Sequence, residues 1–409
     1  MTDHELDRVD KDLKVGMWSP LPPQGSGIAD YSYRILRLLS SHFSMVAVVA
    51  DSACEVVQAP PGIEVVSASV GRLLRFDARI YQMGNHIGFH RFMFFDILDQ
   101  PGLLVLHDPS LFDFFSDLCG GVESEVFREE LRYDSGRNVS PGPVPSIGFV
   151  DGSEEPDRLG VLLCRRLVET SRGVVVNSRW AADTIAERYG VAPRVVPIPS
   201  RPVSLPRSRW GGSARPVFGV LGGIARHKRP VQVVRAFLEL QRDRECALTV
   251  AGRADEHEVV AQLDDLIGSL DAGPRSAVHF VLDPDTEQFE AELRACDVVV
   301  CLRWPTAGEM SAIVPAALSH GCLVLVSDIP QFRELPDSCC WRVPTDPQLE
   351  HSALVALMRR ATDDRAALET ASEAALQYSH DKLRPDSAEA AYVAAISDLV
   401  SHEVGSRDM

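Results

Sequence analysis

Residues 297–328 read DVVVCLRWPTAGEMSAIVPAALSHGCLVLVSD, and this stretch decides the fold. Its pattern predicts a buried strand, a polar loop that begins at Arg303, a helix that opens on Gly308 and Glu309 and closes at Gly321, and a second buried strand. In an open α/β sheet, a loop that leads to a helix N-terminus beside the carboxyl ends of parallel strands receives charged ligands. We therefore expect the floor of an active site here.

Short apolar runs and longer segments of helical period alternate on the N-terminal side of this stretch. Runs of about four to eight apolar residues have the length of strands buried on both faces. The alternation is typical of doubly wound α/β architecture. In the first half we expect strands at 13–18, 45–51, 63–68, 78–83, 103–106, 174–177 and 194–198, with helices between them, notably at 28–42 and 157–169.

Residues 197–216, PIPSRPVSLPRSRWGGSARP, interrupt the alternation with Pro, Gly and Ser. This composition predicts a linker at 206–215 between two Rossmann-like domains at 13–205 and 216–384, after a charged tail at 1–12. Two sheets joined in this way face each other across a cleft. In the second half we expect strands at 217–222, 247–251, 278–282, 297–302 and 323–327, then amphipathic helices at 353–360, 364–378 and 388–402.

Composition limits the function. The 409 residues suit two domains, and a net charge of −17 argues against a nucleic-acid partner, which needs clustered Lys and Arg. No apolar run approaches the roughly 20 residues of a membrane span, and the N-terminus lacks a signal-peptide core, so we expect a soluble, cytoplasmic protein. The nine cysteines lack zinc-ligand spacing, so we expect most to be reduced core residues.

Two glycine-containing loops are suited to a phosphorylated ligand. Gly25, Ser26 and Gly27 follow the first strand and open the first helix, where backbone can approach a ligand closely and free N–H groups favour an anion. In the second half, a strand that ends at Gly222 and Gly223 is followed by Arg226 and Lys228. Glycine amides with one cationic point charge can hold a diphosphate. A turn with an ordinary helix cap is the simpler interpretation of the first loop.

His107 and Asp108 follow an apolar strand. Side chains at that end of a strand point into the cleft, where a His can donate to or accept from a sugar hydroxyl. A plain loop or cap role remains the alternative.

These segments, in this order over residues 13–400, resemble the retaining glycosyltransferases of family 4, which have the GT-B fold. The resemblance implies that the last helix, 385–401, crosses back to the first domain. It also implies that His107 lies near the transferred sugar, that Asp108 supports it, and that Asn85 and His86 line the acceptor side. On the donor side it implies roles for the two glycine loops, for Gly252 and Arg253, and for Gly308, Glu309, Met310 and Ser311.

The sequence departs from the family at three positions. The family uses an Arg five residues before the Lys that matches Lys228, and this chain has Gly223 there; Arg226 is the candidate replacement. The family usually carries two Glu separated by seven residues, which fall here at Gly308 and Ala316. Glu309 could instead turn its carboxylate to the sugar, or it could simply stabilise a helix N-terminus.

The resemblance implies metal-independent transfer of a sugar, with retention, from a nucleotide-diphosphate sugar as co-substrate, with His107, Lys228 and Glu309 as the catalytic residues and no cofactor. Asp283 and Asp285 form an Asp-Pro-Asp sequence that could hold a cation, although it is also a common turn. The alternatives are a pseudo-glycosyltransferase or nucleotide-sugar epimerase, and a catalytically silent subunit that binds a nucleotide sugar. The donor base, the sugar, the acceptor and the oligomeric state stay open.

Overall fold

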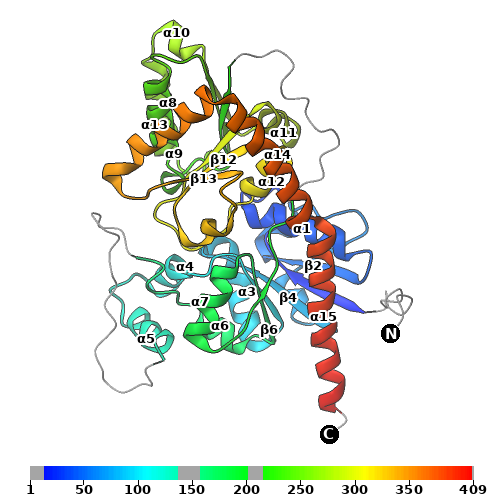
Figure 1. The fold of residues 1–409 in the computed structure, drawn as a ribbon. Helices are drawn as coiled ribbons and strands as arrows, with labels where there is room; N and C mark the ends of the chain where they lie inside the picture. The colour runs from blue at the N-terminus through cyan, green and yellow to red at the C-terminus, as the bar shows by residue number, and fades with distance from the viewer. Residues whose placement is uncertain (1–12, 137–156, 201–214, 408–409) are drawn as a thin grey trace.

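The computed structural model of the protein describes residues 13–136, 157–200 and 215–407 (Figure 1). The predicted tail at 1–12 and all of the predicted linker except Arg215 lie outside the described residues. The described residues form two lobes, each built on one sheet. We call the seven-stranded sheet with its helices the first lobe, and the six-stranded sheet with its helices the second lobe.

Both sheets are wholly parallel, which confirms the predicted doubly wound α/β class. The strand order is β3-β2-β1-β4-β5-β6-β7 in the first lobe and β10-β9-β8-β11-β12-β13 in the second. The strands are β1 (Lys14–Trp18), β2 (Ser44–Val49), β3 (Glu64–Ser67), β4 (Ala78–Met83), β5 (Leu103–Leu106), β6 (Gly173–Val176), β7 (Arg194–Val195), β8 (Val217–Leu221), β9 (Ala247–Gly252), β10 (Val278–Leu282), β11 (Val298–Cys301), β12 (Leu323–Ser327) and β13 (Cys340–Val343).

Helices cover both faces of each sheet. The helices of the first lobe are α1 (Gly27–Leu39), α2 (Ala68–Gly71), α3 (Ile87–Asp99), α4 (Phe112–Leu118), α5 (Glu125–Asp134), α6 (Arg165–Thr170) and α7 (Arg179–Tyr189). The second lobe contributes α8 (Pro230–Leu240), α9 (His257–Gly268), α10 (Ala272–Arg275), α11 (Thr286–Ala295), α12 (Ile313–Ser319), α13 (Pro347–Asp363) and α14 (Arg365–Lys382), and the chain ends in α15 (Pro385–Arg407). Short 3₁₀ helices are η1 (Asp51–Ala53), η2 (Arg226–Lys228) and η3 (Pro330–Glu334).

The central strands are buried on both faces, as their apolar sequences predict. In β11, Val298 and Val300 belong to one hydrophobic cluster while Val299 and Cys301 belong to another. Successive side chains of a strand point to opposite faces, so the second sheet has a core on each side. The nine cysteines all lie in described residues, and each is a free thiol, seven of them buried, in agreement with the expectation of reduced core residues.

The chain order reverses at one place in each sheet, between β1 and β4 and between β8 and β11. Open α/β sheets bind ligands outside the carboxyl ends of strands at such a switch point. The loop that leaves β1 contains Gly25, the loop after β8 contains Lys228, and the loop after β11 contains Glu309. The topology therefore brings the three loops singled out in the sequence to the two switch points.

The last helix, α15, packs against the first lobe, and Figure 1 shows it in red beside the blue strands and α1. The hydroxyls of Tyr392 on α15 and Tyr31 on α1 lie 2.7 Å apart. Arg172 donates to the carbonyl oxygen of Leu399 at 3.1 Å. Within the described residues, no helix combines the length and the apolar character that a membrane crossing requires.

Three local predictions were wrong. The helix expected at 157–169 begins only at Arg165, because Leu163 has a left-handed backbone (φ 55°) that ends any helix running through it. The helix expected to open on Gly308 begins at Ile313, and Gly308 itself has φ 87°. Strand β13 was missed, because CWRV carries a charged residue within its short apolar run.

Candidate active site

The loop after β1 meets the second lobe at Gly25. A Cβ added at Gly25 would lie 2.8 Å from Nε of Arg253, so this glycine leaves room for a side chain of the opposite lobe. At Gly27 an added Cβ would meet nothing within 4 Å, so the start of α1 is open. The Ser26 hydroxyl caps α1 by accepting the N–H of Ile28 at 3.2 Å. The N–H groups of Ala29 and Asp30 donate to the Ser26 carbonyl at 3.0 and 3.5 Å, so what favours an anion in front of the helix is mainly the helix dipole.

His107 follows β5 and is only 8% exposed. Its Nε2 lies 2.8 Å from Oε1 of Gln82, and its ring packs edge-on against Tyr31 with 4.8 Å between the ring centroids. Burial lowers the pKa of His107 to about 4, so the imidazole is neutral at pH 7. A neutral imidazole can serve as one hydrogen-bond donor and one acceptor.

Asp108 joins the two lobes electrostatically. Its Oδ2 accepts the N–H of Asn85 at 2.6 Å, and the side chain is partly buried. The pKa of Asp108 is raised to about 7, first by burial and second by the Glu309 carboxylate of the second lobe, while Arg303 offsets part of the rise. A carboxyl group that titrates near neutrality therefore faces the loop after β11.

Asn85 and His86, both predicted to line the acceptor side, also have structural roles. The Asn85 side chain donates to Oδ2 of Asp113 at 2.6 Å and accepts the N–H of Phe114 at 3.0 Å. His86 caps α3, because its Nδ1 accepts the N–H of Gly88 at 3.2 Å. The amide of Asn85 is thus fully engaged within the first lobe. His86 is exposed and keeps its Nε2 for other contacts.

The loop after β8 presents Lys228 as predicted in sequence, but the lysine has a partner. Its Nζ lies 3.1 Å from Oδ2 of Asp255, and Oδ1 of Asp255 lies 2.8 Å from Nε of Arg253. A Cβ added at Gly252 would overlap the Gly222 backbone, so this glycine lets the ends of β8 and β9 approach. The pKa of Lys228 is lowered, first by burial and then by the nearby Arg303 guanidinium, and Asp255 opposes the shift.

The structure does not bring Arg226 to this cluster. Its guanidinium pairs with Glu258 at 3.2 Å, and its side chain is 66% exposed. The side chain lies on η2 beside Lys228 but points to the surface. The guanidinium groups that lie near Lys228 are those of Arg253, which shares Asp255 with it, and of Arg303, which follows β11 and whose side chain is 12% exposed.

Glu309 is held on both of its oxygens. Oε1 accepts from Nη1 of Arg303 at 2.9 Å, and Oε2 accepts from the Thr306 hydroxyl at 2.9 Å and from the Ala307 N–H at 2.8 Å. Burial acts to raise the pKa of Glu309, but Arg303 and then His227 outweigh it, so the pKa stays below its ordinary value. The carboxylate is ionised and organises the loop.

The same loop contacts the first lobe through Gly308. A Cβ added there would lie 2.6 Å from the Trp180 ring and 3.2 Å from Pro109, and the backbone N–H of Ser110 donates to the Ala307 carbonyl at 2.9 Å. An acidic side chain, as the family carries at this position, has no room. Met310 packs against hydrophobic clusters of both lobes. Ser311 is buried, and its hydroxyl accepts from Arg303 at 3.1 Å.

Arg303, Asp255 and His227 were missed by the sequence reasoning. The sequence could have indicated Arg303 as a site residue, since it closely follows a buried strand at a switch point. His227 is neutral at pH 7, because burial and then Arg303 and Lys228 lower its pKa to about 4. Because Arg303 affects the pKa of both Lys228 and Glu309, these side chains belong to one electrostatic cluster.

The Asp-Pro-Asp sequence serves turns and caps. Asp285 caps α11 by accepting the Gln288 N–H at 2.8 Å, and Asp283 accepts the Ala254 N–H at 3.2 Å. Within the described part of the chain, no group of three or more His, Cys, Asp or Glu side chains could hold a metal ion.

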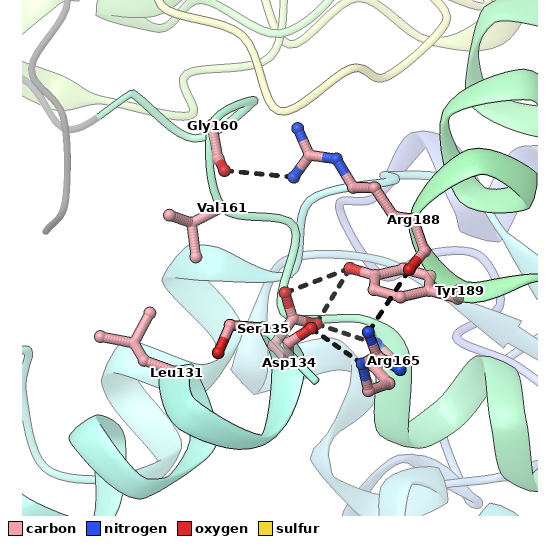
Figure 2. Close-up of a pocket in the computed structure, with 8 residues that line it drawn as sticks. All are labelled: Leu131, Asp134, Ser135, Gly160, Val161, Arg165, Arg188 and Tyr189. Carbon is pink, nitrogen blue, oxygen red and sulfur yellow. Dashed lines mark hydrogen bonds between the residues drawn. The ribbon is translucent and has the colours of Figure 1, made fainter. Parts of the chain in front are cut away.

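A separate cavity of about 180 Å³ lies among α5, α6 and α7 of the first lobe (Figure 2). Its polar groups bind one another: the Tyr189 hydroxyl donates to Asp134 at 2.9 Å, the Arg165 N–H donates to the same carboxylate at 3.1 Å, and Arg188 donates to the Gly160 carbonyl at 3.1 Å. Figure 2 shows that these hydrogen bonds join residues of the cavity wall to one another. None of the predicted site residues lines this cavity.

Comparisons with known proteins concern the fold and the second half of the chain. A sequence profile described as "Glycosyl transferases group 1" matches residues 211–378. Among solved structures, sucrose-phosphate synthase from Thermosynechococcus elongatus superimposes with a TM-score of 0.67 at 13% identity, over 95% of this chain and 100% of that one. No curated protein sequence matches the chain.

Two further solved structures contain nucleotides. Anabaena HepE in complex with UDP and glucose has a TM-score of 0.63 at 14% identity, over 94% of this chain and 100% of that one. The catalytic domain of starch synthase IV from Arabidopsis thaliana, bound to ADP and acarbose, has a TM-score of 0.62 at 11% identity, over 95% and 99%. The fold is therefore GT-B, and residues 211–378 match the glycosyltransferase group 1 profile.

Proposed function

We propose that this chain, whose residues 211–378 match the glycosyltransferase group 1 profile, transfers a sugar from a nucleotide-diphosphate sugar to an acceptor hydroxyl with retention at the anomeric carbon and without a metal ion. One observation carries the proposal. Lys228 lies beside Gly222 and Gly223 at the switch point of the second sheet, and through Arg253 this cluster meets Gly25 of the first lobe. An anion between the two loops would touch both lobes.

The diphosphate is the part of the donor that this site is suited to bind. When the bond from the anomeric carbon to the phosphate oxygen breaks, negative charge grows on the leaving diphosphate, and a preorganised cation lowers the barrier. Lys228 is mostly shielded from water, with its side chain 24% exposed, so its charge acts more strongly than at the surface. The loop of Gly25 leads directly into the N-terminus of α1, whose dipole favours negative charge.

The sugar and the acceptor are assigned to the first lobe. A neutral His107 at the carboxyl end of β5 is suited to a sugar hydroxyl, and Asp108 beside it is suited to the acceptor. In this proposal the bond from the anomeric carbon to the diphosphate breaks, the acceptor oxygen bonds to the anomeric carbon on the same face, and the hydroxyl proton passes to the leaving diphosphate oxygen. Glu309 acts indirectly: it fixes Arg303 and the loop against which donor and acceptor pack.

The nucleotide chemistry is proposed by analogy with UDP in HepE and ADP in starch synthase IV. The first experiment is a thermal-shift screen with UDP, GDP, dTDP and ADP, because a ligand that binds the native state raises the melting temperature. The protein is then incubated with the matching nucleotide sugars and a panel of hydroxyl acceptors, with and without EDTA.

Three readouts separate the candidate functions. Release of nucleoside diphosphate only when acceptor is present supports transfer, and the anomeric proton coupling of the product, compared with that of the donor, reports retention. Conversion of the donor alone indicates an epimerase. Binding without turnover across the panel indicates a silent subunit, and loss of activity in EDTA would overturn the metal-independent mechanism.

A further inference from the structure

A protein carboxylate occupies the place where the donor diphosphate is proposed to bind. Asp255 bridges two cations, with Oδ2 at 3.1 Å from Nζ of Lys228 and Oδ1 at 2.8 Å from Nε of Arg253. The side chains of Lys228 and Asp255 are each 24% exposed. The ammonium group that the proposed function needs is therefore already paired and within reach of solvent.

Glycines on both lobes frame this carboxylate. A Cβ added at Gly223 would overlap the Asp255 carboxylate and would lie 2.6 Å from Nζ of Lys228. Across the cleft, Gly25 abuts the Arg253 side chain that holds the other oxygen. Gly223, where the family has a phosphate-binding Arg, thus lies against the Asp255 carboxylate and its two cations.

The loop that carries Asp255 is bonded to the glycine loop. The Ile224 N–H donates to the Arg253 carbonyl at 2.7 Å, and the Glu256 N–H donates to the Ile224 carbonyl at 3.0 Å. The backbone around Asp255 is therefore fixed relative to Gly222–Lys228. Among the residues that the structure describes, the hydrogen bonds to its carboxylate come from its two cations. A side chain held in this way can rotate without a change in the loop.

We infer that Asp255 determines donor affinity: its carboxylate takes the place of one phosphate in the free protein and releases Lys228 when a diphosphate binds. This inference rests on the proposed function of the Lys228 site. Two anions that converge on one ammonium repel each other, and such like-charge contacts are strongly unfavourable in a partly dehydrated site. A diphosphate has more charge than one carboxylate and therefore displaces it.

A competing role of Asp255 predicts the opposite change in diphosphate affinity. If Asp255 instead held Lys228 in the orientation that a phosphate needs, removal of its charge would weaken binding. Asp255→Asn separates the two roles, because the amide keeps the shape of the side chain and removes its charge.

The test is calorimetric titration of UDP, GDP, dTDP and ADP into wild type and Asp255→Asn, with Asp255→Ser as a second variant and thermal melting as the check of folding. We expect Asp255→Asn to bind the preferred diphosphate at least about tenfold more tightly. The matched control is Glu258→Gln, which removes one carboxylate that pairs with the neighbouring Arg226; it should change the affinity less than about twofold.

A Lys228→Ala background completes the cycle. There, Asp255→Asn should no longer tighten binding, because the competition for the ammonium is gone. The inference is overturned if Asp255→Asn binds the diphosphate no more tightly than wild type does, or if it tightens binding by the same factor in the Lys228→Ala background. If wild type binds a diphosphate in either case, the proposed function still stands. If neither wild type nor variant binds any of the four diphosphates, both fall. Binding by the variant alone supports both.

Discussion

The Glu309 carboxylate lies 2.9 Å from the Arg303 guanidinium, and its other oxygen accepts from Thr306 and from the Ala307 backbone. The two side chains are 14% and 12% exposed, so this ion pair is largely shielded from water. The Gln331 amide donates to the Thr306 hydroxyl at 2.9 Å and extends the network into η3. Glu309 therefore holds the loop that meets the first lobe, in addition to any contact with a ligand.

Glu309→Gln should destabilise the protein. It leaves the Arg303 charge shielded without its partner, and loss of one member of such a pair lowers the free energy of unfolding by about 2 to 4 kcal/mol. Urea denaturation measures this change. The matched control is Glu369→Gln, which breaks an exposed pair with Arg365 and should lower stability by less than about 1 kcal/mol. A stable but inactive Glu309→Gln would contradict the anchoring role.

Lys228→Ala should reduce turnover by roughly a hundredfold or more while the fold stays intact, the scale of losing one group that stabilises developing charge. Steady-state kinetics and circular dichroism measure the two effects. Arg226→Ala is the control, because this side chain lies two residues away, is exposed and pairs outward with Glu258. It should keep most of the activity, and equal losses in both variants would remove Lys228 from its proposed role.

Asp108 should make stability depend on pH. Its pKa is raised to about 7, so between about pH 4 and 7 the folded protein keeps a proton that the unfolded chain has released. The free energy of unfolding from this group therefore falls as pH rises through that window. Asp108→Asn has no titrating group at this position, so its stability should lack this dependence on pH.

The variant should gain about 1 to 2 kcal/mol relative to wild type between pH 4.5 and pH 8, less than the full shift implies because the side chain is partly exposed. Urea denaturation across this range gives the difference. A gap between variant and wild type that stays constant with pH, or narrows as pH rises, would show that Asp108 is not the group responsible.

Tyr31 and Tyr392 should be energetically coupled. Their hydroxyls lie 2.7 Å apart in a buried contact between α1 and α15, and Tyr31 also packs on His107. Tyr392→Phe should lower stability by about 1 kcal/mol, and the double variant with Tyr31→Phe should lose less than the sum of the single variants. Strict additivity in the cycle would mean that this hydrogen bond contributes nothing to docking α15.

Every strand except β13 could be predicted from the sequence, and the loop conformations could not. An apolar run such as VVVC at 298–301 needs two covered faces wherever it lies, so its environment follows from its own composition. The start of α12 depends on distant groups. Gly308 adopts φ 87° against Trp180, and Arg303 holds Glu309 six residues away, so the helix begins only at Ile313.

In the candidate site, too, some residues could be found from the local sequence and others could not. Lys228 and the two glycine loops carry local signals, because in both loops glycines follow the end of a predicted strand and in the second a lysine comes after them. Asp255 carries none: its importance comes from a contact with Lys228, 27 residues earlier in the chain. Arg226 had the right residue type in the right loop, although not at the family's spacing, and its orientation toward Glu258 depends on α9 of the folded lobe.

The central claim is that a diphosphate binds between the lobes, against Lys228 on one side and the Gly25–Gly27 loop on the other. A crystal structure of the protein with the nucleoside diphosphate that raises its melting temperature most tests this directly. The account predicts phosphate oxygens within hydrogen-bond distance of Nζ of Lys228 and in front of the N-terminus of α1. A diphosphate bound elsewhere, for example in the cavity of Figure 2, with Lys228 still paired to Asp255, would contradict it.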